Sequence, residues 1–266
     1  MRRLLGVLLI CALTPLAAGC GAENSVKNAV DPVAQAATRT ASAGSVQLAL
    51  TGAISAAGQE IPINGEGVFD LKGKRGRFDL TTSAPGKGEV RIEELIDGLV
   101  LYMRTDAFGS LPGGKHWLKL DLEELGNKAG VDFAQLQQFS STDPTQFLSY
   151  LKKAGNVKKL GTEDIKGTAT THYRATIDLE KLAGAGGATG NAVRQLEQAT
   201  GVKTIPTEIW IDDQGRVRRQ TLNYDTQRPV ATQVRFTIDY ERFGVPVDVQ
   251  APDKGDTVDL ATLSGG

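Results

Sequence analysis

Between residues 45 and 120 the chain repeatedly alternates apolar and polar side chains, the pattern of half-buried β-strands. The first run places Val46, Leu48 and Leu50 on one face. Five more runs follow, each bounded by turn-forming or charged residues: 67–71, 77–81, 89–92, 99–103 and 117–120. Short strands at regular spacing, separated by turn signals, predict an antiparallel meander.

The middle of the chain has helical spacing instead. Residues 121–128 and 132–139 predict two short helices, and a clearer helix begins at 142–144 (Thr-Asp-Pro). An earlier helix is predicted from Asp31-Pro32 to about Thr40, with the aspartate as N-cap and the proline at the first helical position. Helices thus flank and interrupt the strands.

Strands resume after this helical part. Five are predicted, the first two as a hairpin around Lys166-Gly167: 158–164, 170–178, 204–211, 217–224 and 230–240. Between the second and third of these strands we expect two helices, at 178–182 and 191–200, joined by a glycine-rich linker. The residues after Asp253 are expected to form a loose tail.

About eleven strands result, each with one apolar face. The most economical solution is an α+β fold in which one curved antiparallel β-sheet, a half-barrel, has its concave face covered by the inserted helices. Two separate strand domains are the alternative, but neither block of strands has enough helices to cover its own sheet.

The leader has a different pattern, because a basic start at residues 1–3 precedes an apolar run to about residue 13 and small residues at 17–19. These features define a secretory signal, and the run is shorter than the about 20 residues that a transmembrane helix needs. Leu-Ala-Ala-Gly-Cys at 16–20 resembles the lipobox of bacterial lipoproteins. The resemblance implies cleavage after residue 19 and attachment of diacylglycerol to Cys20, with acyl groups such as palmitate. An ordinary signal peptide with a chance cysteine is the alternative.

Composition narrows the function further. Charged residues make up 23% of the 266 and the formal net charge is -1, so nothing argues for nucleic acid or for a basic face on anionic lipid. Cys11 should leave with the leader, which makes Cys20 the only cysteine of the mature chain and excludes an internal disulfide. We expect residues 20–44 to be the lipidated cysteine and its tether, 45–253 the half-barrel domain, and 254–266 the tail.

A search for catalytic motifs finds no nucleophile elbow, zinc-protease helix, phosphate loop or EF-hand loop. His172 alternates onto the polar side of its strand and is expected at the surface, while Trp210 is expected to cover the outer surface of the sheet. Residues 212–215 fit a hairpin turn better than a calcium site, and 184–190 fit a linker better than a phosphate loop. No catalytic residue, metal ligand or cofactor is predicted.

Several stretches carry a resemblance to a known family: 65–70 (Gly-Glu-Gly-Val-Phe-Asp), 111–117, 143–148, 161–167 with 171–173, and 206–212 with 215–219. Together they resemble the actinobacterial lipoproteins of the LppX, LprA, LprF and LprG type and, more distantly, the LolA and LolB carriers. The resemblance covers roughly residues 45–250 and consists of turns and strands. It implies a half-barrel whose cavity, between sheet and helices, holds acyl chains. Because no ligand motif is shared, no binding residue carries over individually.

We therefore expect an exported lipoprotein, lipid-anchored at the outer face of the cell membrane, that binds acyl lipid or lipidated molecules as a non-catalytic carrier across the envelope. The expected cavity lining consists of the inward apolar positions Phe78, Leu80, Val90, Ile92, Leu101, Met103, Phe147 and Leu151. Ordinary core packing is the alternative for each of them. A void of several hundred Å3 would favour the carrier.

The expected partners are the membrane through acylated Cys20, a lipid or glycolipid ligand, and an envelope transporter; we expect a monomer. The alternative function is an interaction or assembly lipoprotein of the envelope without a lipid cavity, which an exposed apolar patch would favour. An envelope hydrolase is the weakest reading, since the chain offers two histidines and no nucleophile motif.

Overall fold

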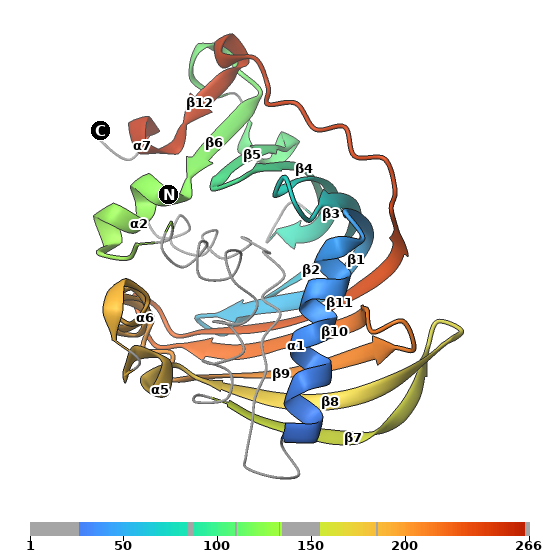
Figure 1. The fold of residues 1–266 in the computed structure, drawn as a ribbon. Helices are drawn as coiled ribbons and strands as arrows, with labels where there is room; N and C mark the ends of the chain where they lie inside the picture. Colours follow the sequence, from blue (N-terminus) through green and yellow to red (C-terminus); the bar gives the residue numbers. More distant parts are fainter. Residues whose placement is uncertain are drawn as a thin grey trace.

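In the computed structural model, residues 27–84, 88–109, 111–132, 134, 155–184 and 186–263 are described (Figure 1). The strands are β1 Ser45–Ala56, β2 Gln59–Asp70, β3 Arg75–Ala84, β4 Gly88–Asp97, β5 Val100–Arg104, β6 Trp117–Asp121, β7 Gly155–Ile165, β8 Thr168–Asp178, β9 Thr204–Asp212, β10 Val217–Thr226, β11 Thr232–Phe243 and β12 Thr257–Asp259. The helices within these residues are α1 Lys27–Ser42, α2 Leu122–Ala129, α5 Leu179–Gly184, α6 Gly187–Thr200 and α7 Leu260–Leu263, with 3-10 turns η1 Asp106–Phe108, η2 Pro112–Gly114 and η3 Lys254–Asp256.

The strands form one sheet of twelve in the order β12-β6-β5-β4-β3-β2-β1-β11-β10-β9-β8-β7. Neighbouring strands are antiparallel except for the parallel pair of β12 and β6. The sheet stays open and curves around a concave side, which α1 crosses (Figure 1). The predicted α+β half-barrel is therefore confirmed, with all eleven predicted strands in place.

The twelfth strand corrects the expectation of a loose tail after Asp253. β12 pairs with the open edge of β6, and Val258 packs into the core with 6% of its surface exposed. Lys119 Nζ also donates to Asp259 Oδ2 at 2.8 Å. Three residues are too few for alternation to be recognised in a sequence, but they suffice to satisfy backbone groups that an edge strand leaves unpaired.

Helix α1 also departs from its predicted start. It begins at Lys27 and contains Pro32, so Asp31 is not its N-cap. Pro32 removes the hydrogen bond to the carbonyl four positions earlier and crowds that carbonyl, which weakens the first turns of the helix. The helix packs against β7, β9 and β10, and Thr40 Oγ1 accepts a hydrogen bond from the Val217 backbone N–H at 2.9 Å. It thereby fixes one half of the concave side.

The other predicted helices divide into three groups. Helix α2 is confirmed, with Asp121 as the N-cap accepting from the N–H groups of Glu123 and Glu124. Helix α5 is confirmed, whereas α6 begins at Gly187 rather than 191 and so takes in part of the expected linker. The predicted helices at 132–139 and from 142 onward lie outside the described residues but for 132 and 134. None of the described helices combines the length and the hydropathy that a membrane span needs.

Two glycines show how the sheet accommodates large side chains on its inner face. A Cβ added to Gly67 of β2 would lie 2.3 Å from the Arg77 carbonyl oxygen and 2.4 Å from the ring of Phe78. Gly52 of β1 has the same relation to Phe236 of β11. The aromatic rings lie over bare backbone there, a device that lets a sheet bend while its apolar face stays filled.

Candidate functional site

The predicted cavity lining lies on the inner face of three neighbouring strands. Of the eight candidates, five are buried with 3–8% of their surface exposed: Phe78, Leu80, Val90, Leu101 and Met103. Ile92 is half-buried and packs against the same core. Phe147, Leu151 and Cys20 lie outside the described residues, so their roles stay predictions.

Strand register brings these candidates together. Leu80 of β3 lies opposite Ile92 of β4, and Ile96 of β4 lies opposite Leu101 of β5. Residues directly opposite one another in an antiparallel pair share a face and are close enough to touch. The inner surface of β3, β4 and β5 is therefore one patch that is apolar apart from a single residue.

Glu94 occupies the middle of this patch, and the sequence analysis missed it. In register it lies opposite Phe78 on β3 and opposite Met103 on β5. Only 3% of Glu94 is exposed, and among the described residues its carboxyl has neither a hydrogen-bond nor an ionic partner. Burial raises the pKa of this carboxyl to about 8. The signal was present in the chain, because counting by twos from Val90 places Glu94 on the inner face.

The other half of the concave side also contains buried polar groups, but these are paired. The Tyr240 hydroxyl of β11 donates to Gln220 Oε1 of β10 at 3.4 Å, and burial raises the pKa of this phenol. Thr207 of β9, also buried, donates to the Thr221 carbonyl oxygen. Glu94 differs from them in lacking such a partner within the described chain.

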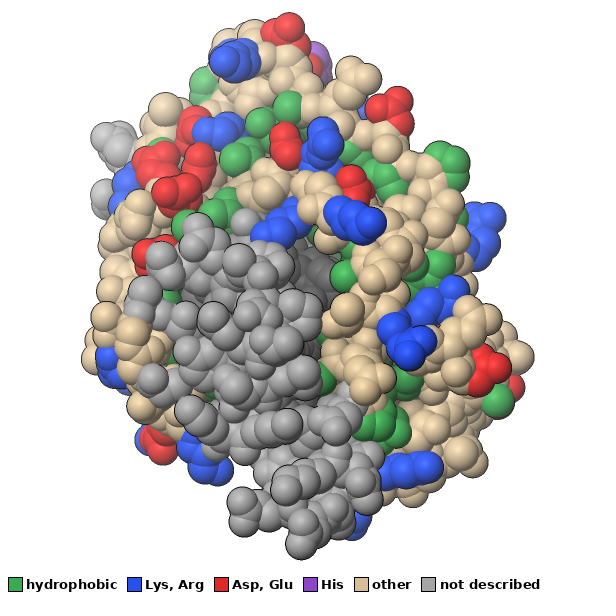
Figure 2. Space-filling model, in the orientation of Figure 1, with side chains coloured by type: hydrophobic (Ala, Val, Ile, Leu, Met, Phe, Trp, Pro, Cys, Tyr) green, Lys and Arg blue, Asp and Glu red, His purple; other side chains and the backbone are tan. Residues whose placement is uncertain are grey.

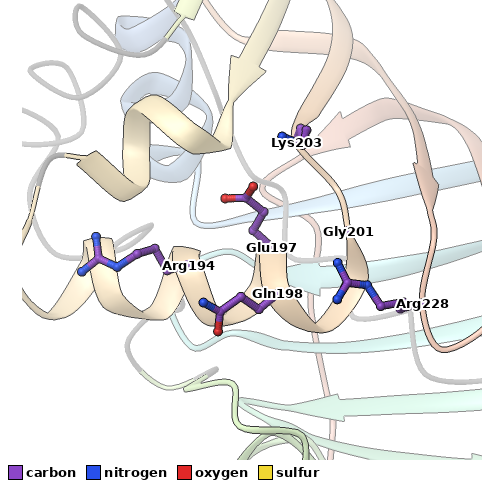
Figure 3. A pocket seen from close by; sticks show the side chains of 6 residues that line it. All are labelled: Arg194, Glu197, Gln198, Gly201, Lys203 and Arg228. Carbon is purple, nitrogen blue, oxygen red and sulfur yellow. The ribbon is translucent and has the colours of Figure 1, made fainter.

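A pocket of about 270 Å3 lies at the C-terminal end of α6 (Figure 3). It is lined by Arg194, Glu197, Gln198, Gly201, Lys203 and Arg228. Two of its cations have structural partners, since Arg194 donates to the Ala183 carbonyl oxygen and Lys203 to Glu180. This polar surface pocket is not the predicted apolar cavity.

A second cluster of ionisable groups lies on the outer face, and it corrects the expectation that His172 is a surface residue. His172 is 7% exposed because the Trp210 ring stacks on it at 4.1 Å between centroids. Its Nδ1 lies 3.0 Å from Glu163 Oε1 and its Nε2 lies 3.0 Å from Glu208 Oε2. Trp210 covers the outer surface of the sheet, as predicted.

The groups around His172 serve packing across β7, β8 and β9. Trp210 Nε1 donates to Glu163 at 2.8 Å. This hydrogen bond holds the pKa of the Glu163 carboxyl below its usual range; burial acts in the opposite direction, and His172 also lowers the pKa. Within the described chain the histidine contacts carboxylates and an indole, not a hydroxyl or thiol nucleophile. The described residues also contain no group of three or more His, Cys, Asp or Glu placed to hold a metal ion.

Comparison with known sequences gives two relatives from Streptomyces. The chain is 30% identical over 195 residues to an uncharacterised 31.2 kDa protein of the rplA–rplJ intergenic region of S. griseus, and 32% identical over 161 residues to SCO4650 of S. coelicolor, named as a candidate lipoprotein. These matches cover 70% and 59% of this chain, but 61% and 47% of the relatives. The chain thus spans less than two thirds of either one. No protein-family model matches it.

Comparison with solved structures identifies the fold. Lipoprotein LppX of Mycobacterium tuberculosis superposes with a TM-score of 0.50 at 15% identity, covering 83% of this chain and 97% of LppX. LprF of Mycobacterium bovis gives 0.47 at 15% identity and covers 88% and 99%. The sequence resemblance to LppX-type lipoproteins is therefore confirmed at the level of the fold.

Proposed function

The chain has the fold of lipoprotein LppX, and on that basis we propose that it is a non-catalytic lipoprotein that binds acyl lipid on the concave face of its sheet. In this proposal it is exported, anchored through acylated Cys20 at the outer face of the cell membrane, and carries its ligand across the envelope as a monomer. The lipobox-like sequence at 16–20 and the lipoprotein naming of LppX and SCO4650 support the anchor.

The apolar patch on β3, β4 and β5 is the observation that carries the proposal. It offers an acyl chain a surface made of Leu, Ile, Val, Phe and Met side chains, on the side of the sheet that the fold encloses. Each methylene that leaves water for such a surface gains about 0.8 kcal/mol, so a single long acyl chain supplies ample binding energy. The ligand classes that fit are acyl lipids and glycolipids, handed on to an envelope transporter.

The described surface gives little support to the alternative of a docking module without a cavity. Its large exposed hydrophobic side chains are Leu160, Val230 and Leu263, which lie on β7, in the β10–β11 connection and on α7. On the face shown in Figure 2, acidic and basic side chains are interspersed and hydrophobic ones form small separate groups. A broad apolar patch of the kind that marks a protein interface is not found among these residues.

Mass spectrometry of co-purifying lipids tests the proposal. The full-length chain with Cys20→Ser is used, so that no acyl group of its own enters the count. Acyl lipid at close to one molecule per protein is the expected result. A folded protein that carries no lipid in repeated preparations, and takes up none from lipid vesicles, would show that it is not a carrier.

A further inference from the structure

Glu94 is an unusual residue for the floor of an acyl-chain site. Its strand presents Val90, Ile92, Glu94 and Ile96 to the inside, so a single carboxyl interrupts an otherwise apolar row. A buried polar group without a hydrogen-bond partner costs about 1–3 kcal/mol. Because no described residue supplies such a partner, the Glu94 carboxyl is free to bond with a ligand.

We propose that Glu94 is the polar anchor of the lipid site and that its carboxyl, in the protonated form, donates a hydrogen bond to an uncharged ester oxygen of the bound lipid. This inference rests on the proposed lipid-binding function and makes it more specific. It assigns the ligand to acyl esters whose linkage region carries no net charge, and it places that linkage between Phe78 and Met103.

The charges around Glu94 agree with a protonated carboxyl. Phe78 and Leu80 face it from β3, and Met103 and Leu101 face it from β5. The other charged residues of β3, β4 and β5 occupy the alternate positions, on the outer face: Arg75, Arg77, Asp79, Glu89, Arg91, Glu93, Asp97 and Arg104. The turn η1 also packs on β4, and its titratable residue, Asp106, is exposed.

With no cation opposite it in the described chain, the Glu94 carboxyl keeps its proton because burial raises its pKa to about 8. A protonated carboxyl can donate to an ester carbonyl, whereas an ionised one can only accept. The hydrogen bond to the ligand should therefore exist at neutral pH and weaken as the pH rises above about 8.

Two probes with the same number of non-hydrogen atoms separate this role from general apolar binding: methyl palmitate, which has one ester, and nonadecane, which has none. Both are offered in radiolabelled form from dioleoylphosphatidylcholine vesicles to the full-length Cys20→Ser chain. In the Glu94→Leu variant the preference for methyl palmitate over nonadecane should fall about fivefold to tenfold, the worth of one hydrogen bond. Glu94→Gln keeps a hydrogen-bond donor, so it should retain most of the preference for methyl palmitate. Its preference should not decline above pH 8, whereas that of the parent chain should.

Glu93→Gln is the matched control, because Glu93 is the adjacent residue and faces outward, where it pairs with Arg77 and Arg104. Its preference should equal that of the Cys20→Ser parent chain. If Glu94→Leu binds both probes with an unchanged preference for methyl palmitate, the assignment of Glu94 is wrong. The carrier function is still supported in that case, because both probes bind. A parent chain that binds neither probe would overturn both proposals. An equal loss of both probes in Glu94→Leu would reduce Glu94 to a structural residue.

Discussion

Replacing Glu94 by glutamine should abolish a large pH dependence in the stability of this chain. The ordinary pKa of the carboxyl is 4.5, and burial raises it to about 8 in the folded protein. Between these two values the folded state holds a proton that the unfolded state has lost. The unfolding free energy of the wild type is therefore unaffected by the ionisation of Glu94 below pH 4.5 and falls as the pH rises from there to about 8.

The size of the effect follows from the width of that window. Each pH unit costs about 1.4 kcal/mol of unfolding free energy, so the whole window amounts to about 5 kcal/mol. That is comparable to the entire stability of many domains, about 5–15 kcal/mol. Glutamine has nearly the same shape as glutamate and never ionises. The unfolding free energy of Glu94→Gln relative to that of the wild type should therefore increase steadily from pH 4.5 to pH 8.

Urea unfolding of both proteins at pH values from 4 to 9, followed by circular dichroism, measures this difference directly. Comparing the two proteins at each pH removes the contribution of every other titrating group. Glu93→Gln serves as the control, because it removes a glutamate from the same strand but from the outer face. Parallel stability curves for wild type and Glu94→Gln would refute the reasoning, since they would mean that the carboxyl ionises alike in both states.

The remaining predictions concern the anchor, the inner glycines, the outer ion pairs and the tail. Metabolic labelling with palmitate should mark the wild type and Cys11→Ser but not Cys20→Ser; label that persists in Cys20→Ser would contradict the proposed anchor. Gly67→Ala should lower the unfolding free energy by about 1–3 kcal/mol, because its Cβ meets the Arg77 carbonyl and the Phe78 ring, whereas Gly184→Ala, with open space around it, should stay within about 0.5 kcal/mol in the same urea titration. Burial raises the pKa of the Asp239 carboxyl, but hydrogen bonds from Arg219 and Lys166 outweigh this effect and leave the pKa below 3.8. The wild type should therefore be more stable than Asp239→Asn above pH 3.8, and this difference in unfolding free energy should shrink as the pH is lowered further. Val258→Asp should free β12 from β6 and speed amide hydrogen exchange at 257–259, while Leu263→Asp, at an exposed position, should not; slow exchange in both variants would show that Val258 does not hold the tail.

The strands could be predicted from the sequence because alternation is a local property. The alternation at residues 46–50 and 234–240 predicts a strand even when their neighbours in space are unknown. β12 was missed for the opposite reason, since only its pairing with β6 makes three residues a strand. The predicted start of α1 was wrong for a related reason: a proline such as Pro32 favours the first turn of a helix but does not fix the residue at which the helix begins.

The two most informative side chains depend on register, which the sequence does not display. His172 is buried because Trp210 and Glu208 of β9 and Glu163 of β7 cover it, and none of these neighbours can be foreseen from residue 172 alone. Glu94 was in principle readable from the alternation of β4. A glutamate on an inward position contradicts the hydrophobic pattern, however, and without the register of β3 and β5 it looks like the end of a strand.

With the proposed anchor at Cys20, the course of α1 would tie one particular edge of the half-barrel to the bilayer. The first turn of α1 lies at the β7 edge (Figure 1), and Lys27 follows Cys20 by seven residues, a span of at most about 25 Å even when fully extended. If Cys20 is held in the headgroups as proposed, β7 cannot leave their vicinity. β12 lies at the opposite edge, eleven strand spacings away or about 50 Å along the curve of the sheet. The proposed anchor would then keep the β7 edge, and not the β12 edge, next to the membrane lipids.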